Sequence, residues 1–284
     1  MLVLTFVQNS SVNKFFVTLL LATLFVACSP NNVNNDEELG QFFKKYQLEG
    51  TFGMFDNGKG NFNIYNVTRF RDSTYQPAST FKVINSLIGI ETGRVIDTNA
   101  VISWDGLTRG RPECDKDLPM NQAFRVSCPP WYQELAKRIG QDTMQHWLDT
   151  LGYGQRYQPF KIQNNLDTFW LDNSAKITAD EQLGIMKRLY FDQLPFQKRT
   201  QRLVRGMMLQ EQNSNYSLSY KTGWGYTEKG HALGWIIGWI EENQHPYFFV
   251  LQVENADRDF NLGAARVNLL KDILKHYGFF EGKR

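Results

Sequence analysis

The stretch QPASTFKVINSL, residues 76–87, places a serine three positions before a lysine at the start of an apolar run. Residues three apart lie on the same face of a helix, so Ser79 and Lys82 are expected to be neighbours. A lysine held against apolar side chains such as Phe81 and Val83 loses its charge easily and becomes a base, which would make Ser79 a nucleophile. The alternative is an exposed lysine whose stem lies along a buried helix.

The composition limits the classes of protein to consider. The chain has 284 residues, of which 42% are hydrophobic and 14% aromatic, enough for one large domain or two intimate ones. Its net charge is +2 and it has no long basic run, so no nucleic-acid partner is expected. Its four histidines show no metal-ligand spacing and there is no G-x-S-x-G sequence, so neither a zinc hydrolase nor an α/β-hydrolase triad is supported and no metal site is predicted.

The N-terminus has the pattern of an export signal. A positive charge at Lys14 precedes an apolar run at 15–27, which is too short to cross a bilayer. Ala27 before Cys28 resembles a bacterial lipoprotein signal, although Phe25 stands where leucine is usual. We therefore expect a signal peptide over 1–28 with Cys28 as the first mature residue, lipid anchoring through Cys28 and a periplasmic location. A buried N-terminal helix is the alternative.

The segments that follow alternate between strand and helix patterns. Residues 29–38 are rich in Asn and Asp and predict a flexible tether before a catalytic domain over 39–284. Asn57-Gly58 between two strand-like runs predicts a β-hairpin. Residues 53–59 also match G-x-x-x-x-G-K, but no Ser or Thr and no helix follows, so nucleotide binding is rejected.

Helix patterns dominate from about 79 to 210, and strand patterns return after 215. Thr178 to Glu181 predicts a capping box that opens one of these helices. The last segment, 261–278, again has apolar residues at helical spacing. Strands at both ends with helices between predict an α+β fold, in which an antiparallel sheet assembled from the two termini is flanked by helices and carries an inserted helical subdomain.

Two further elements follow S-x-x-K in a fixed order. Ser127 lies 48 residues after Ser79, just before a predicted helix, where a second hydroxyl could relay protons. Lys221-Thr222-Gly223 begins 94 residues later in a strand-like run and could hold an anionic substrate. The ordered set S-x-x-K, Ser, K-T-G resembles the penicillin-recognising serine enzymes.

Longer motifs narrow this resemblance. These are PASTFK (77–82), AFRVSCPPWYQELA (123–136), YG (153–154), LDTFWL (166–171) and KTGWG (221–225). Together they resemble the class D (OXA-type) serine β-lactamases, and the likeness runs from about residue 40 to the end. The resemblance implies the fold of serine β-lactamases and penicillin-binding transpeptidases.

The resemblance also implies roles for the residues around the nucleophile. Ser79 would be acylated by the substrate, and Lys82 would be the general base after CO2 converts it to a carbamate. Only a neutral amine attacks CO2, and burial makes a lysine neutral. Trp170 would hold the carbamate through its indole N–H, with Phe81 lining the same cage. The backbone N–H groups of Ser79 and Trp224 would form the oxyanion hole.

A second group of residues would hold and protonate the substrate. By the same resemblance, Ser127 would relay a proton to the β-lactam nitrogen. Lys221, Thr222 and Gly223 would line the side of the substrate carboxylate. Arg266 would pair with that carboxylate, a bidentate task suited to guanidinium.

Two positions depart from the family pattern, and one pair of residues stays open. Pro129 replaces the usual valine of S-x-V, and Gln155 replaces the usual asparagine of Y-G-N. Cys114 and Cys128 remain after removal of the signal, and they either pair as a disulfide or stay as thiols. Sequence spacing does not decide between these states.

The sequence therefore predicts a class D β-lactamase that hydrolyses the β-lactam ring of penicillins and related antibiotics and confers resistance. CO2 or bicarbonate would be required and no other cofactor is implied. Two rivals share the motifs: a β-lactam sensor domain that is acylated without efficient turnover, and a D,D-transpeptidase or carboxypeptidase. Substrate preference and oligomeric state are not determined by these motifs.

Overall fold

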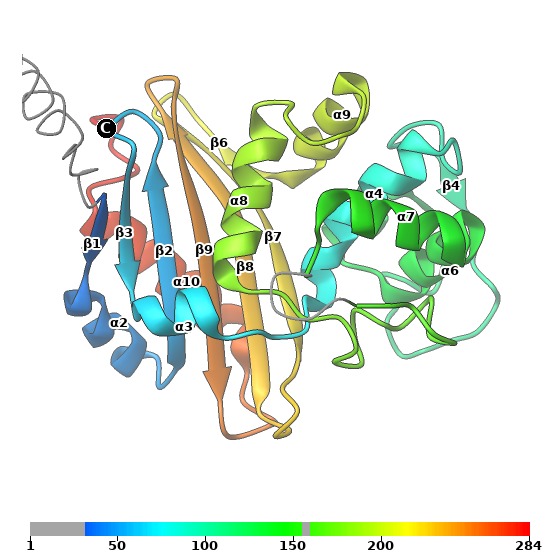
Figure 1. Ribbon diagram of the computed structural model, residues 1–284, viewed down its shortest axis with the longest axis horizontal. Coiled ribbons are helices and arrows are strands. Elements are labelled where there is room, and N and C mark those ends of the chain that lie inside the picture. The colour runs from blue at the N-terminus through cyan, green and yellow to red at the C-terminus, as the bar shows by residue number, and fades with distance from the viewer. Residues whose placement is uncertain (1–31, 155–159) are drawn as a thin grey trace, which may run out of the picture. The chain divides into compact units, whose positions relative to one another are not determined.

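Strands from both ends of the chain form one seven-stranded sheet, in the order β1-β3-β2-β9-β8-β7-β6 (Figure 1). The computed structural model describes residues 32–154 and 160–284, so the predicted signal peptide lies outside the described residues. The strands are β1 (Val33–Asn35), β2 (Glu49–Asp56), β3 (Asn61–Tyr65), β6 (Leu209–Gln212), β7 (Tyr216–Tyr226), β8 (Ala232–Glu242) and β9 (His245–Asn255). A separate two-stranded sheet joins β4 (Val101–Ile102) to β5 (Leu118–Pro119). The predicted sheet from the two termini is confirmed, and it is antiparallel except where β1 runs parallel to β3.

The later part of the predicted tether, residues 33–38, corrects the sequence analysis. Residues 33–35 form β1 and pair with β3, and Asp36 N donates a hydrogen bond to Ile64 O at 2.8 Å. The 3-10 helix η1 (Glu37–Leu39) follows and ends on the fully buried Leu39. A polar composition indicated disorder, but the open edge of β3 offers backbone partners that side-chain composition does not reveal.

The predicted hairpin is confirmed. Strands β2 and β3 pair antiparallel, with Asp56 opposite Asn61. Gly58 N donates hydrogen bonds to Asp56 Oδ1 and to His245 Nε2, each at 2.9 Å. The G-x-x-x-x-G-K stretch is therefore a strand followed by a hairpin turn.

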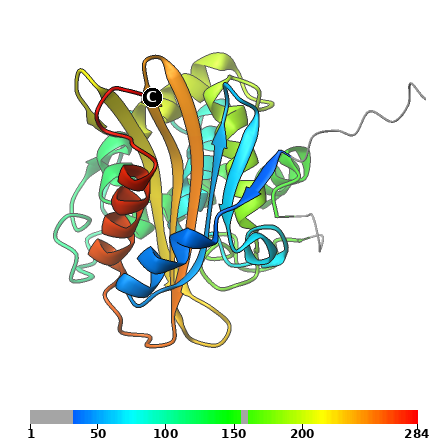
Figure 2. The ribbon, with the colours of Figure 1, turned by 90° about the vertical axis from the view of Figure 1, so that its left-hand side faces the viewer.

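Helices cover both faces of the sheet. They are α2 (Gly40–Lys45), α3 (Val67–Asp72), α4 (Lys82–Glu91), α5 (Met120–Arg125), α6 (Pro129–Ile139), α7 (Gln141–Leu151), α8 (Ala179–Tyr190), α9 (Lys198–Met208) and α10 (Leu262–His276), with a second 3-10 helix, η2 (Ala78–Phe81). Figure 1 shows α8 across one face and α4, α6 and α7 gathered in a helical region beside β7, whereas Figure 2 shows α2 and α10 on the opposite face. In the part of the chain that the structure describes, no helix is both long and apolar enough to cross a membrane.

The central strand β8 shows why two layers of helices are needed. Its side chains alternate between two hydrophobic cores, with Trp235 and Ile237 in one and Ile236 and Ile240 in the other. All four side chains are buried. A strand covered on both faces reads as a continuous apolar run, as HALGWIIGWIEE does.

The capping box that opens α8 gives a test of this layer. Thr178 Oγ1 accepts a hydrogen bond from Glu181 N at 3.1 Å, and Glu181 Oε2 accepts one from Thr178 N at 2.9 Å. We expect Thr178→Ala to lower the free energy of unfolding by about 1 kcal/mol, because the first turn of α8 loses its cap. Urea unfolding measures the loss. Thr178→Ser keeps the hydroxyl and should lose less, and an equal loss for both variants would contradict a capping role.

Candidate active site

The predicted pair of serine and lysine meets in the structure. Ser79 lies in η2 and Lys82 is the first residue of α4, and Lys82 Nζ donates a hydrogen bond to Ser79 Oγ at 2.7 Å. Residues three apart eclipse one another in a 3-10 turn, which is why the two side chains face each other. Ser79 is half-buried and Lys82 is fully buried. The alternative of an exposed lysine is therefore wrong.

Burial makes Lys82 a base. It is the largest of the effects that together lower the pKa of the Lys82 ammonium to about 7; Cys128 raises this pKa, the Arg111 cation lowers it, and Cys114 raises it. The amine lies 5.5 Å from the centre of the Tyr132 ring. A large share of the molecules therefore holds a neutral amine next to Ser79 Oγ at neutral pH.

Trp170 stacks on Phe81, the residue before Lys82, and it has an unused hydrogen-bond donor. Its side chain is 1% exposed, and its indole Nε1 has no hydrogen-bond partner. The indole stacks on Phe81 at 5.1 Å between ring centroids. Trp170 O accepts a hydrogen bond from Ala78 N at 2.9 Å, so the same residue also fixes the backbone before the serine. A buried, unpaired N–H costs free energy unless a ligand satisfies it.

The second hydroxyl and the K-T-G strand also come together. Lys221 Nζ donates hydrogen bonds to Ser127 Oγ at 3.0 Å and to Thr222 O at 3.1 Å. Ser127 adopts a left-handed backbone with φ of 56°, which turns the chain between α5 and α6. Lys221 is buried, and burial together with the Lys82 and Arg266 cations holds the pKa of its ammonium well below the usual value. This pair can therefore pass a proton.

Arg266 reaches the same strand from α10. Its Nη1 donates a hydrogen bond to Gly223 O at 2.8 Å, and its Nε has no partner. Burial lowers the pKa of the guanidinium to about 10, so Arg266 stays a cation at neutral pH. The side chain of the next strand residue, Trp224, is 48% exposed.

Of the two departures and the two cysteines, the structure describes Pro129, Cys114 and Cys128. Pro129 begins α6, where proline is favoured because its fixed φ suits the first turn. Gln155 lies outside the described residues. Cys114 and Cys128 are buried free thiols, and burial and a hydrogen bond from one thiol to the other raise the pKa of Cys114 to about 12. A thiol of such high pKa is a poor nucleophile.

The sequence analysis missed the residues that close the cage behind Lys82. Asn85 Nδ2 donates a hydrogen bond to Tyr132 O at 3.1 Å, and the hydroxyls of Ser86 and Tyr132 lie 2.9 Å apart. All three side chains are fully buried. The available signal was a pair of polar residues, Asn85 and Ser86, in an otherwise apolar helix, but their partner on α6 could not be read from spacing.

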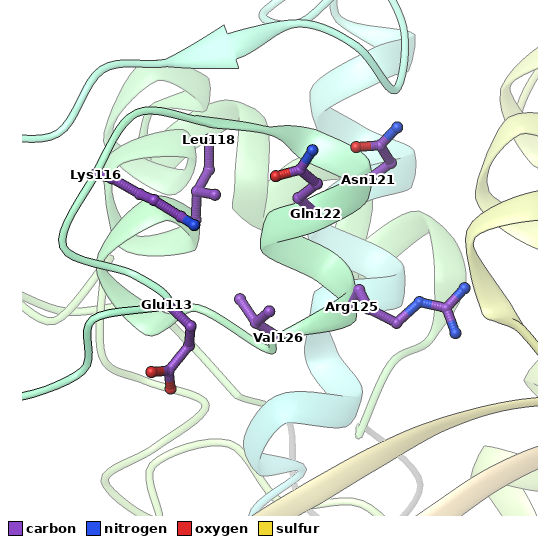
Figure 3. Close-up of a pocket in the computed structure, with 7 residues that line it drawn as sticks. All are labelled: Glu113, Lys116, Leu118, Asn121, Gln122, Arg125 and Val126. Atoms are coloured by element: carbon purple, nitrogen blue, oxygen red, sulfur yellow. The ribbon is translucent and has the colours of Figure 1, made fainter.

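A pocket of about 350 Å³ adjoins the helix that leads to Ser127 (Figure 3). Its lining residues are Glu113, Lys116, Leu118, Asn121, Gln122, Arg125 and Val126. Arg125 donates hydrogen bonds to Leu209 O and Gln210 Oε1, which connects α5 to β6. No predicted site residue lines this pocket. Within residues 32–154 and 160–284, no group of three or more His, Cys, Asp or Glu side chains could hold a metal ion.

The burial of Lys82 has a measurable cost. The pKa of Lys82 is near 10.5 in the unfolded chain and about 7 in the folded protein. This lowering of the pKa opposes folding by about 4 kcal/mol at pH 7. The unfolded chain binds the extra proton between these two values, so this cost falls as pH rises from 7 to 10. We expect Lys82→Met to be more stable than the wild type by a few kcal/mol at pH 7 in CO2-free buffer, with an advantage that shrinks by pH 9.5. Urea unfolding at both pH values measures it, and an advantage independent of pH would contradict the assignment.

Comparison with known proteins agrees with this geometry. The penicillin binding protein transpeptidase domain family matches residues 31–275. The probable β-lactamase YbxI of Bacillus subtilis is 37% identical over 87% of this chain and 86% of its own length.

Solved structures show the same relationship. A class D β-lactamase from Nostoc superposes with a TM-score of 0.80 at 34% identity, over 86% of this chain and 99% of its own. The C-terminal domain of the Bacillus licheniformis BlaR penicillin receptor has a TM-score of 0.80 at 27% identity, over 88% and 98%. With a matching family over most of its length and relatives above 30% identity, the chain belongs to the class D β-lactamases of the penicillin-binding transpeptidase fold.

Proposed function

We propose that this protein hydrolyses the β-lactam ring of penicillins and related antibiotics through an acyl-enzyme on Ser79 and thereby confers resistance. The observation that carries the proposal is the buried amine of Lys82, whose pKa is lowered to about 7, at 2.7 Å from Ser79 Oγ. A serine is a weak nucleophile until an adjacent base takes its proton.

The residues divide the reaction into two half-reactions. In acylation, Ser79 Oγ attacks the carbonyl carbon, its proton passes to the base at position 82, and the ring C–N bond breaks. The leaving nitrogen takes a proton from Ser127, which recovers one through Lys221, its hydrogen-bond partner at 3.0 Å. The base then loses its proton to solvent and Lys221 takes one from solvent, so both groups are reset. In deacylation, water attacks the ester carbon and its proton passes to the base. The bond from the acyl carbon to Ser79 Oγ breaks, the base gives its proton to Ser79 Oγ, and the ring-opened acid leaves.

We propose that Lys82 is carboxylated by CO2. The neutral amine is the form that adds CO2, and the unpaired indole N–H of Trp170 supplies a donor for the resulting carboxylate. As a carbamate, Lys82 would offer an oxygen base to both half-reactions. Phe81 and Tyr132 keep bulk water away from this position, because both are fully buried.

Three cationic or polar groups are proposed to bind the substrate carboxylate. Lys221, Thr222 and Arg266 lie together on one side of the site, where Arg266 is fixed by its hydrogen bond to Gly223 O. The backbone N–H groups of Ser79 and Trp224 are proposed as the oxyanion hole, a kind of site typically worth about 3 kcal/mol.

The location of the enzyme is proposed from its N-terminus. The apolar run before Cys28 would export the chain to the periplasm, and a lipid on Cys28 would anchor it to the membrane.

The chief rival is a sensor domain, since the BlaR receptor domain shares this fold. A sensor is acylated without efficient turnover, and a cell-wall transpeptidase also releases penicillin slowly. Steady-state hydrolysis of benzylpenicillin and a chromogenic cephalosporin separates these functions. We expect sustained turnover that increases with added bicarbonate and vanishes in Ser79→Ala. A stoichiometric burst without turnover would reject the β-lactamase proposal.

Trp170→Phe tests the carbamate. The variant keeps the stack on Phe81 but loses the indole N–H, so a carboxylate on Lys82 would lose its donor. We expect turnover to fall at least tenfold in CO2-depleted buffer and to recover partly in excess bicarbonate. A ¹³C-bicarbonate NMR signal that is present in the wild type and absent in Lys82→Met checks the modification directly. Equal bicarbonate dependence of Trp170→Phe and wild type would contradict this role of the indole.

A further inference from the structure

A short chain of buried hydrogen bonds connects helix α8 to the nucleophile turn. Gln182 Nε2 donates to Thr80 Oγ1 at 2.8 Å, and Thr80 Oγ1 donates to Pro77 O at 2.6 Å. The side chains of Gln182 and Thr80 are each 1% exposed. The two residues are 102 positions apart, so this contact fixes the turn to a separate layer of the fold.

Helix α8, which carries Gln182, is itself held in place by its N-terminal cap and by packing on the sheet. It begins with the capping box of Thr178 and Glu181, and it packs on strands β8 and β9. Burying an amide is unfavourable unless it is hydrogen-bonded. The Gln182 amide therefore holds Thr80 at a defined position, since Thr80 Oγ1 is the acceptor that the structure gives to Nε2.

Thr80 in turn lies where the nucleophile turn contacts the K-T-G strand. A Cβ placed on Gly223 would lie 3.1 Å from Thr80 Cγ2 and 3.1 Å from Pro77 O. Because glycine has no side chain, β7 and η2 approach so closely that a side chain at position 223 would be tightly crowded. Ser79 directly precedes Thr80, and Trp224 directly follows Gly223. The backbone N–H groups of Ser79 and Trp224 are the proposed oxyanion hole.

The turn itself needs such support. Ala78 has a positive φ of 48°, which an L-residue adopts only where its surroundings enforce it. The bond from Ala78 N to Trp170 O fixes one side of the turn, and the bonds from Gln182 through Thr80 to Pro77 fix the other.

We propose that Gln182 is a positioning residue that sets the spacing of the oxyanion hole through Thr80 and Gly223. The inference rests on the oxyanion hole proposed above. Gln182 touches no substrate, and its effect is exerted on the geometry of two backbone N–H groups. Displacements of the order of 1 Å at such donors are enough to lower a rate about a hundredfold.

The test compares Gln182→Met with a matched control, Gln201→Met. Gln201 is also a fully buried glutamine on a helix, but it bonds Leu194 O and Phe196 O away from the site. The readout is the acylation rate for a β-lactam and for its thiocarbonyl analogue, because sulfur accepts hydrogen bonds poorly and a working oxyanion hole prefers oxygen. Thermal unfolding of each variant is recorded in parallel.

We expect Gln182→Met to slow acylation by the carbonyl substrate at least tenfold and to reduce the preference for oxygen over sulfur. Gln201→Met should lower the unfolding temperature but keep the wild-type preference. A Gln182→Met enzyme with the wild-type preference would overturn the role of Gln182. A wild-type enzyme with no preference for oxygen would instead overturn the oxyanion hole itself.

Gln182→Glu gives a second readout if the Met variant does not fold. A protonated glutamic acid can donate to Thr80 Oγ1 but a carboxylate cannot, and burial raises the pKa of a carboxyl group. We expect the acylation rate relative to wild type to increase as pH falls, with circular dichroism confirming that the variant stays folded. A ratio independent of pH would overturn the proposal.

Discussion

The rest of the site depends on one buried lysine. Lys82 is fully buried in an apolar and aromatic cage, and its pKa near 7 places a neutral amine against Ser79 Oγ. Folding opposes this placement by about 4 kcal/mol at neutral pH, a large share of the net stability of a typical domain. The two hydrophobic cores on either side of the sheet offset that cost. The fold must therefore be stable enough to bury a lysine whose charged form is disfavoured.

The topology brings the parts of the site together from distant segments. The nucleophile turn and α4 belong to the helical region, whereas Lys221 and Gly223 lie on β7 and Arg266 lies on α10 behind the sheet. Arg266 packs against β8 at Gly234, where a Cβ would lie 2.7 Å from Val253 Cγ2 and in ordinary contact, at 3.4 Å, with Arg266 Cδ. Glycine at 234 is therefore required by the packing of β8 on Val253 of β9, and the stem of Arg266 lies beside it.

Local patterns predicted what depends on local geometry. The Ser79–Lys82 contact follows from helical spacing, and the hairpin and the capping box follow from turn and cap chemistry. Features that depend on long-range packing could not be predicted in this way. The strand β1 needed the edge of β3, and the cage wall formed by Tyr132 needed α6 to pack on α4. The resemblance to a family supplied Trp170 and Arg266, which no periodicity in this single sequence would have selected.

Burial and nearby charges act differently on the two lysines of the site. Burial is the main cause that disfavours the charged form of Lys221; Lys82, in the molecules where it is protonated, and the Arg266 cation add to it. An anionic substrate reverses the balance at Lys221, because a nearby carboxylate favours the ammonium form. The amine of Lys82 lies 5.5 Å from the centre of the Tyr132 ring, and its neutral form is set chiefly by burial. Substrate binding would therefore favour the charged form of Lys221, the lysine proposed to donate through Ser127, whereas burial keeps Lys82 in the neutral form that is proposed to add CO2.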